Sequence, residues 1–535
     1  MTANIAWIDW LIIAVYCIGL LALAAYLARG QGSRDDYYVG GRTIGAWPVG
    51  ISIMATQCST NSILGAPAFV AFAAGGGLVW LQYELAVPLA MIVLILFFMP
   101  LFRHFNLISV YAYLEKRFDL TTRLTLSGLF LFIRAFATSV TVYSIAIVID
   151  LITGLGFVYS VLILGLFTVV YDVMGGIRGV IYSDVIQLLI LVIMLILVFV
   201  FLLSELGGFS AVWQSFEQDR KLALDFANHG LGDGQTFAFW PMLFGGLFLY
   251  VSYYGCDQSQ VQRQLSTANI DTTNRALFLN GVLRFPLVLL YCFVGVGIAV
   301  YASKSPEFIA ALPVENGVPE YNLAVPLYMI NSLPVGLVGL SLVALFAAAM
   351  SSLDSVLNSL SATTMEDFVR RFHKGHWSDK KELIYSRWIT SIWGVITLVM
   401  AFFVGDIAPT VLEAINKIGS LANGPILAVF LLGFFAKRVG GKAAVTGLLA
   451  GILSNALCWL YLPEISWLWW NVFGCFISFV VAYLLSFMQA NPLLSGLKPD
   501  TARAYLQRES ELNWPQRSLL LLIWFCLLLG LLWLI

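Results

Sequence analysis

Charged side chains are scarce in this sequence. Only 11% of its 535 residues are charged, whereas a soluble domain carries about 25%. The formal net charge of −1 provides no basic surface that would attract nucleic acid, so we expect no nucleic-acid partner. Hydrophobic residues make up 60% of the chain. This composition is typical of an integral membrane protein, whose first partner is the lipid bilayer.

Clusters of metal-binding or disulfide-forming residues are also lacking. The seven cysteines are odd in number and scattered, mostly inside apolar runs, which argues against a disulfide framework or a zinc site. The four histidines fall in polar connections with no cysteine beside them. Because the sequence has no nucleotide-binding loop, catalytic triad or metal cluster, we expect neither an enzyme nor an organic cofactor. A channel is also disfavoured, since no repeated filter segment is present.

Long apolar runs dominate instead and predict an all-α membrane protein with about fourteen transmembrane helices. The predicted spans are residues 7–28, 46–73, 78–101, 124–152, 156–174, 180–203, 236–256, 276–302, 322–365, 386–404, 410–435, 443–462, 465–488 and 518–534. The first run carries Asp9 where a signal peptide would be basic, so we expect a retained helix. The ninth run is over-long and should contain a short lead-in before a crossing that begins near Pro334.

The distribution of positive charge predicts the topology. With the N-terminus placed outside, most of the 29 Lys and Arg, including Arg263, fall in alternate connections, which the positive-inside rule makes cytoplasmic. The outside connections hold only Arg220, Lys221 and Lys304, and the spans hold Arg134, Arg284 and Lys417. We therefore expect a multi-pass protein of the plasma (inner) membrane with both termini extracytoplasmic.

Polar residues interrupt the second and seventh spans in mid-membrane, at residues 54–62 and 252–260. Lipid cannot satisfy polar groups, so irregular backbone persists only where it lines a cavity. The two spans are five apart, and an odd number of crossings inverts the second unit relative to the first. Interrupted helices at matching positions of two halves indicate a transporter's binding site. The alternative is that these small and polar residues only allow close helix packing.

Three segments of the chain resemble the sodium:solute symporters, which include sodium-coupled glucose, sialate, proline, monocarboxylate and multivitamin carriers. They are residues 171–187, with Gly-Gly followed by Ser-Asp-Val-Ile-Gln, residues 254–263, with Asp257-Gln258 and Gln262-Arg263, and residues 347–359, with Ser351-Ser352 and Asn358-Ser359. The resemblance runs from about Trp7 to Lys442. Residues 65–68 and 357–367 are most similar to the monocarboxylate and multivitamin branch.

The resemblance implies a LeuT-type core, a five-plus-five inverted repeat, in a protein that functions as a monomer. It implies sodium-coupled symport of a small polar organic solute by alternating access. The expected division is a peripheral first helix with a cytoplasmic loop (1–45), a first five-helix repeat (46–203), an extracellular or periplasmic loop (204–235), a second repeat (236–435) and three peripheral helices (436–535).

The resemblance also implies a main sodium site, with sodium as the coupling ion. Its ligands would be the carbonyls of Ala55, Cys58 and Ala348 and the hydroxyls of Ser351 and Ser352. Hard cations prefer oxygen ligands, and unwound helices expose free carbonyls. In a helix, the two serines lie one turn beyond Ala348 on the same face. The alternative is that both hydroxyls donate back to a carbonyl one turn earlier.

A second sodium site is implied at Asp184, Asp354 and Ser355. Some relatives bind a second sodium with the acid that Asp184 matches, together with hydroxyls one turn beyond the pair that Ser351 and Ser352 match. Asp354 departs from the family, in which Ser, Thr or Ala is common there. It either strengthens a cation site or reaches cytoplasmic water. Asp184, in turn, either binds sodium or is an acid in a helix's first turn, where the macrodipole favours it.

The candidate solute site consists of polar and ionisable residues on five helices. They are Gln57, Ser59, Thr60, Ser62, Glu84, Tyr250, Tyr253, Arg284 and Arg134. Buried ionisable residues mark functional sites by default, and arginine suits carboxylates through its two-pronged donors. We therefore favour a small organic anion such as a monocarboxylate.

Three alternatives remain for the solute site. Glu84 matches a sugar-contacting glutamate of the glucose branch, which indicates a sugar or polyol as the alternative solute. Glu84 and an arginine could also simply pair with each other. A transporter-like solute sensor is a further alternative, since some relatives carry kinase domains, although we expect none in this chain.

Overall fold

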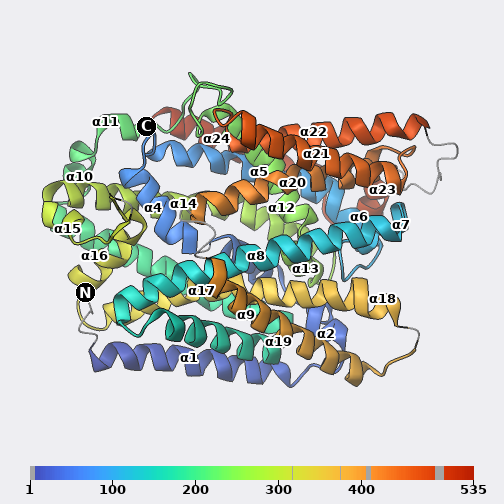
Figure 1. Cartoon of the computed structure of the whole chain (residues 1–535), viewed down its shortest axis with the longest axis horizontal. Helices are drawn as coiled ribbons and strands as arrows, with labels where there is room; N and C mark the ends of the chain where they lie inside the picture. Colours follow the sequence, from blue (N-terminus) through green and yellow to red (C-terminus); the bar gives the residue numbers. More distant parts are fainter. Residues whose placement is uncertain (1–5, 59, 316, 374, 405–410, 489–498) are drawn as a thin grey trace.

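Apolar helices lie side by side along the long axis of the molecule (Figure 1). The computed structural model describes residues 6–58, 60–315, 317–373, 375–404, 411–488 and 499–535. Within these residues, 11 helical spans are long and apolar enough to cross a membrane. The strands β1 (Val314–Glu315) and β2 (Val318–Pro319) form a small antiparallel hairpin. The predicted all-α class is confirmed.

The helices have the following bounds. They are α1 (Trp7–Ala28), α2 (Arg34–Val39), α3 (Ala46–Gln57), α4 (Thr60–Phe72), α5 (Ala86–Val93), α6 (Met99–His104), α7 (Ala112–Arg117), α8 (Leu120–Thr153), α9 (Phe157–Leu206), α10 (Phe209–Ser215), α11 (Gln218–Lys221), α12 (Gly246–Cys256), α13 (Gln258–Leu265), α14 (Ile270–Lys304), α15 (Pro306–Ala310), α16 (Ala324–Ser332), α17 (Leu337–Thr363), α18 (Arg370–Phe372), α19 (Asp379–Val404), α20 (Val411–Phe435), α21 (Gly441–Tyr461), α22 (Trp467–Leu485), α23 (Pro499–Glu509) and α24 (Trp514–Trp533). Tighter or wider turns occupy Gly40–Arg42, Leu78–Leu85, Leu94–Phe98, Pro241–Gly245, Tyr321–Leu323, Thr364–Val369 and Ser486–Met488.

The crossings predicted fifth and sixth are joined in α9, which has 50 residues. A straight helix of that length would extend about 75 Å, far beyond a bilayer. The helix breaks at Gly176, where φ is 55° and ψ is −160°. A Cβ atom there would lie 2.7 Å from the Tyr37 ring, so the break requires glycine. If α9 is counted as two crossings and the two interrupted helices are added to the 11 long spans, the described residues contain all fourteen predicted crossings.

Both interruptions predicted from the polar runs are confirmed. The helix α3 ends at Gln57, and Cys58 has a non-helical ψ of 64° before α4 begins at Thr60. The helix α12 ends at Cys256, and Asp257 has an extended ψ of 125° before α13 begins. The predicted lead-in to the ninth crossing is α16, separate from α17.

Several basic connections meet at one end of the molecule. Arg178, at the turn of α9, donates from Nε to the carbonyl oxygen of Gly40 at 3.1 Å. Arg42 donates from Nη1 to the carbonyl oxygen of Leu265 at 3.1 Å, and Arg103 donates from Nη1 to that of Thr267 at 2.9 Å. The start of α1 and the end of α24 lie at the opposite end (Figure 1). These connections, which were predicted to be cytoplasmic, therefore lie together at the end of the molecule opposite the start of α1 and the end of α24.

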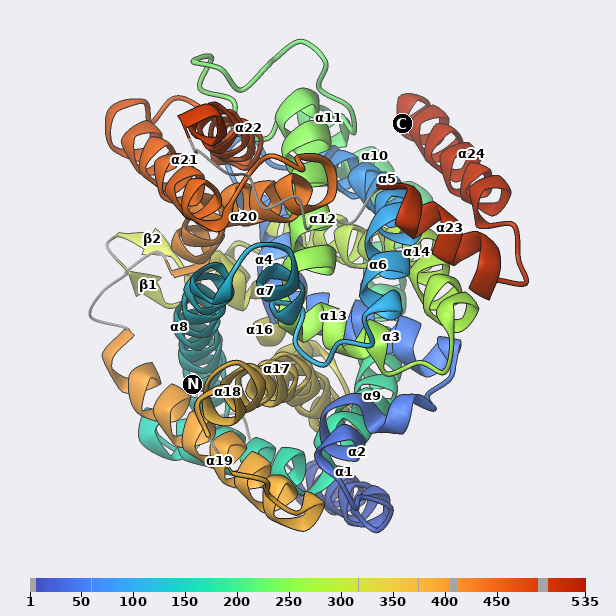
Figure 2. The ribbon, with the colours of Figure 1, turned by 90° about the vertical axis from the view of Figure 1, so that its right-hand side faces the viewer.

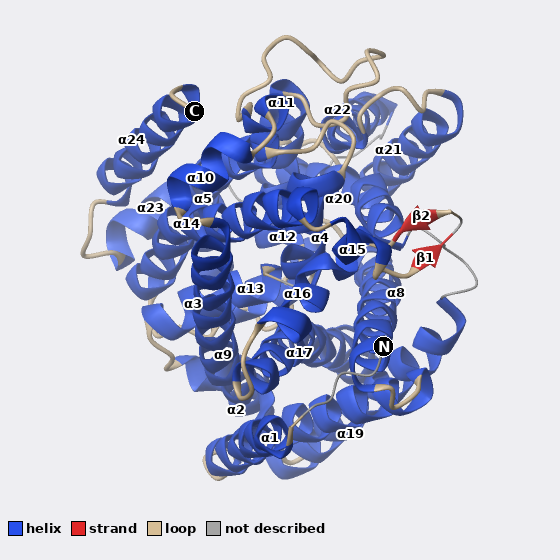
Figure 3. Ribbon diagram, turned by 90° about the vertical axis from the view of Figure 1, so that its left-hand side faces the viewer, coloured by secondary structure: helices blue, strands red, loops and turns tan. Residues whose placement is uncertain are grey.

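The two interrupted helices lie inside the bundle. Viewed from either end, α12 and α13 lie centrally, whereas α1, α19, α21 and α24 form the rim (Figures 2 and 3). The rim helix α1 is fastened by Asp9, which is 1% exposed. Its Oδ1 atom accepts backbone N–H bonds from Gly336 at 2.8 Å and Gly339 at 2.7 Å, at the start of α17.

Candidate functional site

A cavity of about 720 Å³ lies beside the two interrupted helices. Its wall combines residues of α4, α8, α12, α14 and α20 with the turn Leu78–Leu85. The cavity extends to Ala74 after α4 and to Glu320 after β2. These connections lie towards the end of the molecule that holds α15 and the start of α1 (Figure 1). The cavity thus reaches from mid-bundle towards the predicted outside.

The structure brings the predicted solute residues together in this cavity. Those with described side chains that line it are Gln57, Ser62, Glu84, Arg134, Tyr250, Tyr253 and Arg284. Ser59 and the side chain of Thr60 lie outside the described residues. Residues separated by more than 200 positions therefore share one wall, as their placement on interrupted and neighbouring helices predicts.

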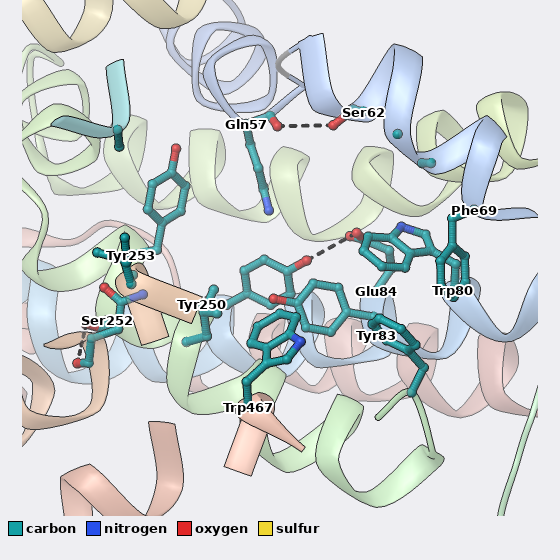
Figure 4. Close-up of a pocket in the computed structure, with 18 of the residues that line it drawn as sticks. Gln57, Ser62, Phe69, Trp80, Tyr83, Glu84, Tyr250, Ser252, Tyr253 and Trp467 are labelled. Atoms are coloured by element: carbon teal, nitrogen blue, oxygen red, sulfur yellow. Dashed lines mark hydrogen bonds between the residues drawn. The ribbon is translucent and has the colours of Figure 1, made fainter. Parts of the chain in front are cut away.

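One wall of the cavity is an ion pair between Arg284 and Glu84, and Figure 4 shows the hydrogen bond that Glu84 accepts from Tyr250. The Nε atom of Arg284 donates to Glu84 Oε2 at 3.2 Å, and the Tyr250 hydroxyl donates to Oε1 at 3.1 Å. Both charged residues are at most 3% exposed. The Nη1 atom of Arg284 has no hydrogen-bond partner within the described part of the chain. The arrangement neutralises Glu84 and leaves one guanidinium nitrogen unengaged.

A second ion pair lies at the inner end of the cavity. Arg134 of α8 donates from Nε to Asp257 Oδ2 at 2.5 Å, and its guanidinium lies 5.1 Å from the centre of the Tyr253 ring. Asp257 forms the break between α12 and α13, and its Oδ1 atom also accepts the N–H of Ser259 at 2.8 Å. The pair therefore ties α8 to the second interrupted helix. Arg134 keeps 23% of its side chain exposed.

Aromatic rings supply much of the remaining wall, and the sequence analysis missed most of them. Phe69, Trp80, Tyr83 and Trp467 line the cavity on one side of Tyr250 in the close-up view (Figure 4). They come from three different segments, so no local pattern identifies them. Ring faces offer flat apolar surfaces on which a cyclic or chain-like solute can pack.

A carbonyl of α3 lies beside the predicted sodium ligands of α17, and it belongs to Thr56, which lies between the predicted ligands Ala55 and Cys58. The Ser352 hydroxyl lies 3.5 Å from the Thr56 carbonyl oxygen and 3.4 Å from that of Ala348. The Ser351 hydroxyl donates to the same Ala348 carbonyl at 3.2 Å. Cys58, where α3 unwinds, is fully buried. Both serine hydroxyls thus bond to a carbonyl one turn earlier, as the alternative interpretation predicts. These hydroxyls also lie beside the end of α3, where unwinding exposes backbone carbonyls.

The predicted second-site residues also lie together, but an arginine lies among them. The Ser355 hydroxyl donates to Asp354 Oδ1 at 3.1 Å. Arg263 of α13 donates from Nη2 to the Ser355 hydroxyl, and the same atom lies 3.4 Å from Asp184 Oδ2. Ser52 donates to that Asp184 oxygen at 2.5 Å. The guanidinium therefore supplies positive charge between Asp184 and Ser355.

Within the described residues, no group of three or more His, Cys, Asp or Glu is placed to hold a metal ion. Sodium does not need such a group, because carbonyl and hydroxyl oxygens serve as ligands for hard cations. The oxygens gathered at Thr56, Ala348, Ser351 and Ser352 belong to this class.

A family model named "Sodium:solute symporter family" matches residues 37–451. The chain belongs to the sodium:solute symporter family. The family resemblance inferred from the three motifs is thereby confirmed, and the motifs all lie inside the matched range. Members of this family are sodium-coupled transporters, not enzymes.

Curated relatives cover most of this symporter. It is 29% identical to the sodium/sialic acid symporter NanT of Aliivibrio fischeri, over 91% of this chain and 94% of that protein. It is also 29% identical to the sodium-dependent multivitamin transporter of Oryctolagus cuniculus, over 85% and 70% of the two chains.

A solved structure titled as a substrate-bound, outward-open, Na+-coupled sialic acid symporter has the same fold, with a TM-score of 0.80. At 24% identity it covers 91% of this chain and 100% of its own. The LeuT-type architecture of the symporter is confirmed by this match.

The burial of two charged residues was not anticipated from the sequence. Arg263, counted in a cytoplasmic connection, is fully buried, because α13 continues inside the bundle after the break at Asp257. Asp172, quoted only as part of a motif, is also fully buried. The available signal was its position: an acid inside an apolar run marks a functional site by default.

Proposed function

We propose that this protein carries a small polar organic solute across the plasma (inner) membrane together with sodium, by alternating access. One observation carries the proposal. The Thr56 carbonyl oxygen lies beside the Ser352 hydroxyl, near the Ala348 carbonyl and the Ser351 hydroxyl of α17, and Thr56 directly precedes the cavity residue Gln57 where α3 unwinds. An ion at these oxygens would fix the end of α3, and Gln57, which lines the cavity, is the residue at that end. Sodium binding and solute binding are thereby coupled through a single segment.

A small organic anion, such as a monocarboxylate, is the proposed solute. Arg284 lines the cavity and bonds to Glu84 through its Nε atom, and the side chain of Arg134 is partly exposed in the cavity. Arginine binds carboxylates through two parallel donors. Curated relatives of the chain are named for sialic acid and for monocarboxylates, which supports an acidic solute.

A sugar or polyol is the second candidate, and it is favoured by a different observation. Both arginines already pair with a carboxylate of the chain, Arg284 with Glu84 and Arg134 with Asp257. A neutral solute would leave both pairs intact and could stack its apolar faces on the aromatic wall. Hydroxyl groups of such a solute could bond to Gln57 or Glu84.

Uptake into proteoliposomes tests the proposal. Labelled acids, sugars and amino acids are offered in turn, with a sodium gradient or with choline in place of sodium. We expect uptake of one solute class that requires sodium. Uptake that is equal in choline would overturn sodium coupling. Binding of a solute without any uptake would favour the transporter-like sensor instead.

A further inference from the structure

Buried negative charge exceeds buried positive charge where α9 packs against α17. Asp172, Asp184 and Asp354 are all fully buried, and Arg263 is the guanidinium in electrostatic reach of all three. An uncompensated carboxylate inside a protein is strongly unfavourable, because the lost hydration has no replacement. Part of this charge must therefore be neutralised by something other than the chain's own bases.

The guanidinium of Arg263 is committed to the Asp184 side of this region. Its Nη2 atom reaches Asp184 and Ser355, its Nε atom donates to Ser52 at 2.7 Å, and its Nη1 atom donates to the Ser259 carbonyl. Asp184 thus has a cation beside it. Asp354 has only neutral donors among its hydrogen-bond partners: the Tyr171 hydroxyl, the Ser183 hydroxyl at 3.4 Å and that of Ser355.

Asp172 has no charged hydrogen-bond partner within the described part of the chain. It is fully buried, and neither of its carboxylate oxygens accepts a hydrogen bond of good geometry there. The Asn358 amide lies beside it as a neutral donor, and the Asp354 carboxylate is close enough to repel it. Asp354 and Asn358 lie four residues apart and therefore on one face of α17. Asp172 thus faces α17 at the level of Asp354 and Asn358, with at most one neutral amide to compensate its charge.

We propose that Asp172 and Asp354 together bind a monovalent hard cation, with sodium as the coupling ion. The proposal rests on the proposed sodium symport and assigns the second ion to this pair instead of to Asp184, whose charge Arg263 already balances. Two carboxylates supply up to four oxygens, and the Tyr171 and Ser183 hydroxyls lie on Asp354. Oxygen ligands of this kind suit a hard cation.

The position of the pair fits an ion that follows the first one through the protein. Along α17, Ser351 and Ser352 are followed one turn later by Asp354 and Ser355, and Asn358 lies one turn beyond. The later residues are nearer the end at which the basic connections meet. A cation leaving the main site along α17 would therefore reach Asp354 and Asp172 next.

Counting bound ions tests the proposal. Purified carrier is equilibrated with radioactive sodium, choline being the inert replacement, and the bound ions per protein are measured for the wild type and for Asp172→Asn. We expect two ions in the wild type and one in the variant. Asp172→Glu keeps the charge and should keep two ions, with a weaker second affinity. It also preserves the test if the asparagine variant does not fold.

Thermal stability supplies a second readout with a matched control. In choline buffer, Asp172→Asn should melt above the wild type, because it removes an uncompensated charge. Asp367→Asn should melt below it, because Asp367 is equally buried but fully paired, with Arg123, Ser109 and Ser127. Adding sodium should then stabilise Asp172→Asn less than the wild type.

Three results would overturn the assignment. One is an unchanged ion count in well-folded Asp172→Asn. Another is a wild type that binds a single ion, and the third is an asparagine variant with wild-type stability in choline, which would mean that Asp172 holds a proton. Failure of the proposed sodium symport would give a different result from failure of this assignment. In that case the wild type itself would bind no sodium at Ser351 and Ser352.

Discussion

The solute cavity and the α9–α17 interface treat buried charge in opposite ways. In the cavity each arginine has a carboxylate: Arg284 pairs with Glu84, and Arg134 pairs with Asp257. At the α9–α17 interface three buried aspartates share Arg263. A balanced cavity can accept an anion or a neutral molecule without a net electrostatic penalty. An interface with excess negative charge favours a cation, so the structure constrains the proposed ion site more strongly than the solute site.

The difference also separates two kinds of coupling. A solute in the cavity meets groups that are already neutralised, so its binding energy depends on local hydrogen bonds and ring contacts. A sodium ion at the proposed second site would meet carboxylates that lack a cation of their own, so its binding would remove repulsion that the empty protein carries. Substitutions in the two regions should therefore affect different measurements, and the following experiments are ordered by the size of the expected effect.

The largest effect is expected at the main sodium site. Replacing both Ser351 and Ser352 by alanine removes two hydroxyl ligands, so sodium-driven uptake should be abolished, or its half-saturating sodium concentration should rise severalfold. Ser341→Ala is a matched control, because Ser341 lies on the same helix but its hydroxyl bonds to the Leu337 carbonyl at 2.7 Å and to the Met194 sulfur at 3.5 Å, away from the proposed ligands. Unchanged sodium dependence in a well-folded double variant would refute the site.

Arg284 tests whether the balanced cavity binds an anion. If Arg284 contacts a carboxylate, Arg284→Gln should lose about 1.5–3 kcal/mol of solute binding, or roughly 10- to 150-fold in affinity. The variant also leaves Glu84 buried without its cation, which should lower the melting temperature. The double variant Glu84→Gln/Arg284→Gln should recover the stability but not the affinity. Recovery of both would make Arg284 a partner of Glu84 only.

A smaller change is expected when Arg134 is freed. Asp257→Asn removes its carboxylate partner, and asparagine can still cap α13, since it is as good an N-cap as aspartate. The pair is partly exposed, so about 1 kcal/mol or less is involved. The affinity for an anionic solute should then rise up to about fivefold, measured by competition against the labelled solute. A neutral solute should bind to Asp257→Asn with the same affinity as to the wild type. An unchanged affinity for the transported solute would therefore favour a sugar or polyol over an anion.

Much of the fold was predictable because membrane helices obey local rules. The first predicted helix matches α1 residue for residue, and both interruptions follow from polar runs that lipid cannot accommodate. The placement of Ser351 and Ser352 beside the Ala348 carbonyl also follows from helical spacing, whereas their role as sodium ligands stays a prediction. These inferences needed only neighbouring residues and the known thickness of a bilayer.

The charge pairing was not predictable, because it depends on tertiary contacts. Arg284 and Glu84 are 200 residues apart, and no local pattern indicates their partnership. Arg263 follows a polar segment, so the positive-inside rule assigned it to a loop, whereas α13 buries it against Asp184. The position of Asp172 in an apolar run before a Gly-Gly turn indicates a candidate functional acid. Only its packing against α17 reveals that it is fully buried with no charged hydrogen-bond partner among the described residues.

The smallest numerical effect concerns the number of ions, and it links the two regions. We expect two sodium ions per solute, so uptake should rise with sodium at a Hill coefficient above one. Asp354→Ala should lower that coefficient towards one, a change of about twofold in slope. The control is Ser341→Ala, which should keep the wild-type coefficient.

The energetics explain why the second ion matters. One sodium falling through 100 mV gains about 2.3 kcal/mol, and a tenfold gradient adds about 1.4 kcal/mol. A single ion could therefore concentrate a neutral solute roughly 500-fold. A monoanion carried with one sodium forms a neutral complex and loses the voltage contribution, leaving about tenfold. A second sodium restores the positive charge, so uptake of an anion should increase with an inside-negative potential in the wild type and lose this response in Asp354→Ala. A wild-type Hill coefficient of one, with a flux ratio of one sodium per solute, would contradict the ion count and make Asp354 a structural acid.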